Sequence, residues 1–129
     1  MCDSIEDMQS VLNGVRKIIR NRDSIGICLD TGHANLSNIL PEYIAAFGKD
    51  IITMHIHDNY GYMGGNRSKA EDDMHNIPGS GNIDWKDVFI KIYESGYNNV
   101  LMLELTASHN NDKNINKILI KAREFLNKL

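Results

Sequence analysis

The chain has 129 residues, of which 42% are hydrophobic and 24% charged, a composition typical of one globular domain with an adequate core. A formal net charge of −3 excludes a strongly basic protein built to bind nucleic acid or an anionic membrane surface. The first residues do not show the charged and then apolar pattern of a signal peptide, and no apolar stretch reaches about 18 residues. Cys2 and Cys28 are too few for a disulfide framework. We therefore expect one soluble, cytoplasmic domain over residues 1–129.

Apolar periodicity predicts helices and strands that alternate along the chain. Apolar residues three or four positions apart indicate helices, and short runs that are apolar throughout indicate buried strands. Pro41 falls inside one helical stretch, where it predicts a break or a restart. In chain order we predict a helix over 4–19, a strand over 25–29, a helix over 36–47, a strand over 51–57, a loop over 58–82, a helix from 84 to a cap at Gly96, a strand over 100–105 and a helix over 112–129.

This order predicts an α/β fold in which parallel strands are joined by right-handed helical crossovers. Three strands are too few to close a barrel, so we expect the sheet to have open edges. We expect Cys28 to be buried in its apolar strand, and Tyr93, Ile115 and Leu119 to lie on the inner faces of their helices. The loop over 58–82 is rich in glycine, and a loop of this length is usually functional or disordered.

Polar side chains stand at the ends of the predicted strands. Asp30 directly follows the first strand, while His55 and Glu104 lie late in the second and third. Because the carboxyl ends of parallel strands lie on one side of a sheet, these side chains can converge. Asp30 could instead be only a turn former and His55 a hydrogen-bonded core histidine, but a carboxylate between two leucines needs a partner. One imidazole and two carboxylates suit a divalent cation such as Mn, Mg, Co or Zn, and we predict that these residues bind one.

Four sequence motifs follow one another along the chain. They are residues 26–35 (GICLDTGHAN), 54–59 (MHIHDN), 73–75 (DMH) with 78–85 (PGSGNIDW), and 101–105 (LMLEL). In this order they resemble the sixth strand, the seventh strand, the loop after it and the eighth strand of xylose-isomerase-like barrels, a superfamily of sugar isomerases, epimerases and family 2 AP endonucleases. The resemblance implies a partial (β/α)8 TIM barrel, consisting of parallel strands 6 to 8 with flanking helices.

The resemblance also implies roles for individual residues. Asp30, His55 and Glu104 would bind the central divalent metal, with a fourth ligand, a glutamate, in the half of the barrel that is not in this chain. Glu104 and that glutamate would transfer a proton at the carbon alpha to a sugar carbonyl, while the metal stabilises charge on the substrate oxygen. His33 would act beside them and contact a substrate oxygen. His57 would either bind substrate or support neighbouring groups.

An alternative function comes from a second set of residues. His33, Asp73 and His75 resemble the group that holds an additional zinc in AP endonucleases of the endonuclease-four type, which cleave DNA at abasic sites. The acidic run around Asp73 could instead be a solvated loop, and the net negative charge argues against nucleic acid as a partner. A third possibility is a non-catalytic barrel fragment.

The expected partners follow from these functions and from the short length. The substrate would be a small sugar or sugar phosphate, with no role for a membrane. Because a complete barrel of this kind needs roughly 250 residues, we expect the open edges to be covered by a homo-oligomer or by the missing N-terminal half. We expect weak or no catalysis from this chain alone.

Overall fold

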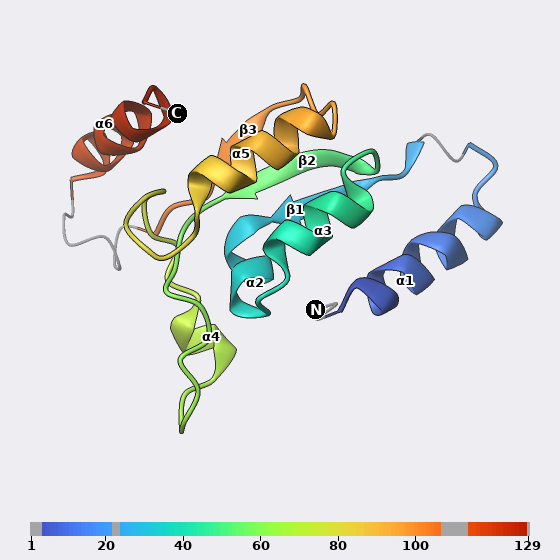
Figure 1. Cartoon of the computed structure of the whole chain (residues 1–129), viewed down its shortest axis with the longest axis horizontal. Coiled ribbons are helices and arrows are strands. Elements are labelled where there is room, and N and C mark those ends of the chain that lie inside the picture. Colours follow the sequence, from blue (N-terminus) through green and yellow to red (C-terminus); the bar gives the residue numbers. More distant parts are fainter. Residues whose placement is uncertain (1–3, 22–23, 107–113, 129) are drawn as a thin grey trace.

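The computed structural model describes residues 4–21, 24–106 and 114–128, and it contains a three-stranded parallel sheet in the order β1-β2-β3 (Figure 1). The strands are β1 (Ile27–Asp30), β2 (Ile51–Ile56) and β3 (Leu101–Leu103). The helices are α1 (Ile5–Ile18), α2 (Thr31–Leu36), α3 (Leu40–Phe47), α4 (Lys69–Asp72), α5 (Trp85–Glu94) and α6 (Ile115–Leu126). The predicted α/β class, with parallel strands flanked by helices, is therefore confirmed.

The connection between β1 and β2 contains two helices: α3 lies within the predicted range 36–47, and a shorter helix that was not predicted precedes it. Asp30 caps a short helix, α2, by accepting the backbone N–H of His33, and this helix ends at Ser37. A second helix, α3, then starts with Pro41 in its first turn, where proline costs no hydrogen bond. Pro41 therefore marks a restart. The predicted long loop also contains the short helix α4, and the predicted first residues of the last helix, 112–113, lie outside the described residues.

The hydrophobic core lies between one face of the sheet and the helices. Leu29, Met54 and Ile56 point from the strands into this core, where they meet Phe47 of α3 and Val88 of α5. Trp85 is buried, as expected for the start of α5. In a smaller buried cluster, Ile118 and Ala122 of α6 pack against Ile77.

Four predictions of burial were wrong. Side chains alternate between the faces of a strand, so Leu29 in the core places Cys28 on the other face, where it is exposed. Tyr93 is 85% exposed, and Ile115 and Leu119 are about half exposed. Tyr93, Ile115 and Leu119 lie at the borders of the apolar faces of α5 and α6, where the rest of the described chain does not cover them.

The sheet has open surfaces. Each outer strand has one neighbour in the sheet as described, and Met102, like Cys28, is exposed on the face away from the helical core. No helix in the described parts of the chain has the length and apolarity to cross a bilayer.

Candidate metal centre

The carboxyl ends of the three strands bring Asp30, His55 and Glu104 together. Asp30 is the last residue of β1 and is paired in register with His55 of β2. The backbone N–H of Glu104, one residue beyond β3, donates to the carbonyl of Ile56 at 3.1 Å, which fixes Glu104 beside the same strand. One nitrogen or oxygen atom from each of these three side chains lies within 4.8 Å of the others. The convergence that the sequence predicts is therefore present.

The distances within this group suit a shared cation. His55 Nδ1 lies 2.5 Å from Glu104 Oε2 and 3.8 Å from Asp30 Oδ2. Ligands about 2.0–2.2 Å from a cation stand roughly 3 Å from one another. Glu104 Oε2 is itself buried and, within the described chain, has no directed hydrogen bond despite the short contact to His55. A buried carboxylate oxygen without a donor is costly unless a positive charge satisfies it. The residues present therefore fit a divalent cation.

Asp30 is held in a defined orientation. Its Oδ1 accepts the backbone N–H of His33 at 2.9 Å and a ring nitrogen, Nε2 of His57, at 2.8 Å. Burial opposes ionisation of Asp30, but these hydrogen bonds, first from His57 and then from His33, together with the electrostatic effect of the two rings, lower the pKa of its carboxyl below the ordinary value. Asp30 is therefore a carboxylate at neutral pH, with Oδ2 directed toward His55 and His33.

A second group of possible ligands forms beside the first. His33 Nε2 lies 2.8 Å and His75 Nε2 3.2 Å from Asp73 Oδ2, and donor atoms from these three residues lie within 4.8 Å of one another. The other nitrogen of His33 is 3.2 Å from Asp30 Oδ2, so His33 stands between the two groups. Asp73 Oδ1 is buried and has no hydrogen-bond partner among the described residues.

The loop that carries Asp73 and His75 folds back over the strand ends through backbone bonds. Asp58 and Asn76 form an isolated antiparallel bridge with two hydrogen bonds of 2.9 Å. The backbone N–H of Thr106 donates to the carbonyl of His75. His75 itself has a left-handed backbone conformation, with φ of 47°. These contacts bring the His33, Asp73 and His75 side chains together, as the resemblance implies.

A third combination of donor atoms, from His57, His75 and Glu104, does not make a good site although they are close enough. The rings of His57 and His75 are parallel within 1° and stacked, with centroids 3.9 Å apart. Imidazole lone pairs lie in the ring plane, so two stacked rings cannot both direct a nitrogen at one cation. Among the described residues there are therefore two ligand groups with a geometry that suits a cation.

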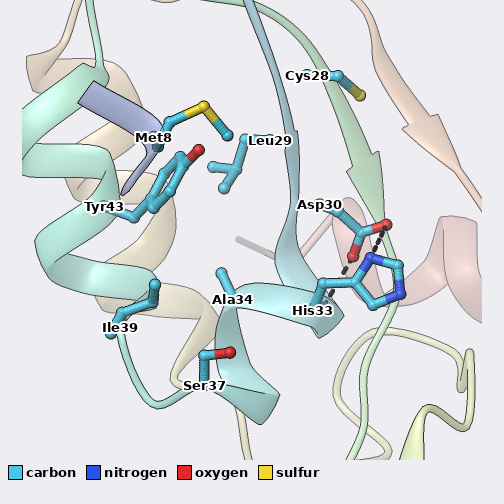
Figure 2. Close-up of a pocket in the computed structure, with 9 residues that line it drawn as sticks. All are labelled: Met8, Cys28, Leu29, Asp30, His33, Ala34, Ser37, Ile39 and Tyr43. Atoms are coloured by element: carbon cyan, nitrogen blue, oxygen red, sulfur yellow. Dashed lines mark hydrogen bonds and ion pairs between the residues drawn. The ribbon is translucent and has the colours of Figure 1, made fainter. Parts of the chain in front are cut away.

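A pocket of about 140 Å³ lies at the open edge of β1. Figure 2 shows Met8, Leu29 and Tyr43 on one side of this strand and Asp30 and His33 on the other, pointing toward one another. The pocket thus has an apolar part against the helices and a polar part formed by residues of the ligand groups.

Several residues that hold the site were missed in the sequence. The buried hydroxyl of Thr31 donates to the carbonyl of His57 at 2.8 Å and accepts its N–H at 3.1 Å. A Cβ on Gly32 would lie 2.0 Å from the ring of His57, so the close approach requires glycine. The buried carboxylate of Asp58 accepts the backbone N–H of Gly79 in the loop and the indole N–H of Trp85 in α5. Thr31, Gly32 and Asp58 all lie within the sequence motifs described above. Which groups their side chains bond to depends on the fold and could not be predicted from the motifs.

A parallel sheet with convergent polar side chains at its carboxyl ends is the arrangement found in part of a (β/α)8 barrel. The sequence model of the xylose isomerase-like TIM barrel family matches residues 1–129. The chain belongs to this family.

The chain is also similar to two uncharacterized proteins and to one protein of known structure. MJ1311, an uncharacterized protein of Methanocaldococcus jannaschii, is 35% identical over 115 residues, which are 85% of this chain and 33% of that protein. The uncharacterized protein y4fM of Sinorhizobium fredii is 34% identical over 85 residues, 64% of this chain and 24% of that protein. A D-tagatose 3-epimerase-like protein of known structure has a TM-score of 0.63 and 30% identity, over 91% of this chain and 39% of that one. The matched region thus covers between about a quarter and two fifths of the length of these proteins.

Proposed function

We propose that this chain supplies the carboxyl-terminal part of the active site of a metal-dependent sugar or sugar-phosphate isomerase or epimerase. The observation that carries the proposal is the convergence of Asp30, His55 and Glu104 at the carboxyl ends of three parallel strands. Membership of the xylose isomerase-like family and the likeness to an epimerase-like structure support it. The activity of the full-length relatives comes to this chain only as part of the proposal.

Each residue of the group has a role in this proposal. Asp30, His55 and Glu104 would hold one Mn, Mg, Co or Zn ion, which when bound supplies positive charge that stabilises negative charge on a substrate oxygen. Glu104 has the most exposed side chain of the three, at 43%, and can exchange a proton with the carbon alpha to the carbonyl. His33, whose side chain is 32% exposed, can hydrogen-bond a substrate oxygen. The second acid/base group, a glutamate, would come from the rest of the barrel.

Cation binding tests the first part of this proposal. Isothermal titration of the chain with Mn²⁺ or Co²⁺ is expected to show an exchangeable site that depends on Asp30, His55 and Glu104. Asp30→Asn and Glu104→Gln remove a charged ligand each and are expected to weaken binding at least tenfold. Asp87→Asn, which changes an exposed carboxylate on α5, is the matched control and is expected to bind like the wild type. Wild-type affinity in the Glu104→Gln variant would refute the proposed ligand set.

Proton exchange tests the second part. In D₂O, the chain alone is expected to exchange the alpha proton of a ketose or ketose phosphate weakly or not at all. Co-expression with the part of MJ1311 outside its matched region would supply a candidate for the missing glutamate. We expect exchange in that complex and its loss in the Glu104→Gln variant. Rapid epimerisation by the purified chain alone would contradict the proposed division of the active site.

Cleavage of DNA at abasic sites is the second candidate function. The assembled group of His33, Asp73 and His75 favours it, because it can hold a further zinc ion. The net charge of −3 argues against a DNA partner. Several tightly bound zinc ions together with cleavage of an abasic oligonucleotide would favour the nuclease, whereas one exchangeable Mn or Mg ion would favour the isomerase. If Glu104→Gln changes neither metal content nor activity, the chain is a non-catalytic fragment.

We also propose that the open surfaces of the sheet are covered in solution by a second copy of the chain or by the N-terminal part of a barrel. Exposed Cys28 and Met102, and the pocket along the free edge of β1, support this proposal. A monodisperse monomer in light scattering would count against self-association.

A further inference from the structure

The imidazole of His57 is completely buried beneath the candidate metal centre. It follows β2 by one residue, and its Nε2 lies 2.8 Å from Oδ1 of Asp30. A carboxylate can only accept hydrogen bonds, so Nε2 carries the proton and donates it. Because the ring has no exposed surface, it cannot contact a substrate in this conformation. The sequence left two roles open for His57, and its burial favours support of a neighbouring group.

The surroundings of His57 leave its ring little freedom. Gly32 lies against one edge of the ring, so closely that a methyl group there would be 2.0 Å from Cε1. The ring of His75 is stacked on one face at a centroid distance of 3.9 Å. The hydroxyl of Thr31 bonds the backbone of His57 on both its N–H and its carbonyl. The direction of the Nε2–H bond is therefore fixed by packing.

The two oxygens of Asp30 have different environments as a result. Oδ1 accepts two hydrogen bonds, from His57 Nε2 and from the backbone of His33. Oδ2 faces the ring nitrogens of His33 and His55, at 3.2 and 3.8 Å, and His55 in turn contacts Glu104. Occupation of Oδ1 by fixed donors thus selects Oδ2 as the oxygen available to a cation.

We propose that His57 is a positioning residue, which orients Asp30 so that Oδ2 alone is presented to the metal. The inference rests on the proposed function, because it takes Asp30 as a ligand. A buried donor behind a metal-binding side chain typically changes metal affinity by 10- to 100-fold. The stacked ring of His75 also connects His57 to the second ligand group, so a change at His57 should alter the environment of His75 as well.

Two substitutions separate the hydrogen bond from the packing. His57→Phe keeps an aromatic ring between Gly32 and His75 but loses the donor to Asp30. His57→Gln places an amide N–H near the position of Nε2 and can donate again. We expect Co²⁺ affinity to fall 10- to 100-fold in His57→Phe and to recover to within a few-fold of the wild type in His57→Gln. Far-UV circular dichroism without cation checks that each variant is folded.

The outcomes distinguish this inference from the proposed function. If the wild type binds Co²⁺ and His57→Phe binds it equally well, the positioning role is refuted and the metal site stands. If the wild type binds no cation while its fold is intact, the metal site is refuted and the positioning role with it. Should His57→Phe fail to fold, nitrogen-15 NMR of the wild type decides. An Nε2–H tautomer of His57 supports the inference, and an Nδ1–H tautomer overturns it.

Discussion

Replacement of Asp58 by alanine tests how the glycine-rich loop is held over the strand ends. The Asp58 side chain is fully buried, and its Oδ2 accepts the backbone N–H of Gly79 at 2.9 Å and the indole N–H of Trp85 at 2.8 Å. Its Oδ1 accepts the N–H of Asn59 at 2.9 Å and, more distantly, that of Ile83. Alanine would leave these donors without an acceptor in a site closed to solvent.

The expected loss of stability follows from these contacts. A hydrogen bond to a charged group contributes about 1.5–3 kcal/mol, but the donors act as one network and partial opening lets water in. We therefore expect Asp58→Ala to lower the free energy of unfolding by about 3–5 kcal/mol, the range for breaking a buried ionic group. Trp85→Phe removes one donor and keeps most of the apolar ring, so we expect a smaller loss of about 1–2 kcal/mol.

Equilibrium unfolding in urea, followed by circular dichroism, measures both changes. Asp87→Ala is the control, because Asp87 lies on the same helix as Trp85 but its carboxylate is partly exposed and forms an ion pair with Lys91 near the surface. We expect this control to differ from the wild type by no more than about 0.5 kcal/mol. If Asp58→Ala proves no more destabilising than Asp87→Ala, the reasoning about the buried network is wrong.

Three further predictions follow. The backbone N–H of Met63 is the largest cause that lowers the pKa of Asp72 below its ordinary value of 3.8, so the carboxylate stabilises this loop above pH 3.8. As the pH falls below that value, the stabilisation is lost, and amide exchange at Met63, corrected for its intrinsic pH dependence, should accelerate. Mn²⁺ at about 100-fold its Kd should raise the stability in thermal unfolding by about 2.7 kcal/mol, reversibly with EDTA. In Glu104→Gln, whose affinity is expected to be at least tenfold weaker, the gain at the same Mn²⁺ concentration should fall to about 1.4 kcal/mol or less. Gly79→Ala should destabilise the chain in urea by at least 1–2 kcal/mol, because φ is 83° and the new methyl group would lie 2.3 Å from the ring of Phe125.

The sheet and the main ligand group could be predicted because both depend on simple periodic rules. Apolar runs of strand length, separated by helical stripes, indicated parallel strands, and parallel strands place their carboxyl ends on one side. Asp30, His55 and Glu104 could therefore be brought together from the sequence alone. Whether they bind a cation stays a prediction.

The errors have equally specific causes. Cys28 lies in a strand whose side chains are apolar on both faces, and burial of all of them requires that both faces of the sheet be covered. In the described chain the face that carries Cys28 is not covered. The helix α2 was not predicted because it has only six residues, too few to show a helical periodicity. It also begins with Thr31 and Gly32, a pair typical of a turn. By alternation His57 should share the face of His55, but β2 ends at Ile56 and the chain turns, which places the ring beneath α2.

The position of Asp30 between a strand and a helix affects what can be inferred about function from the sequences of distant homologues. One oxygen of the Asp30 side chain caps the N-terminus of α2. Asparagine or serine at this position could therefore preserve the helix after the ability to bind a metal had been lost. Glu104 stands just past the end of a strand, and no helix in the described chain begins on its side chain. A polar residue retained at position 30 is thus weak evidence that a homologue is an enzyme, whereas a glutamate at position 104 is the more informative mark of a working centre.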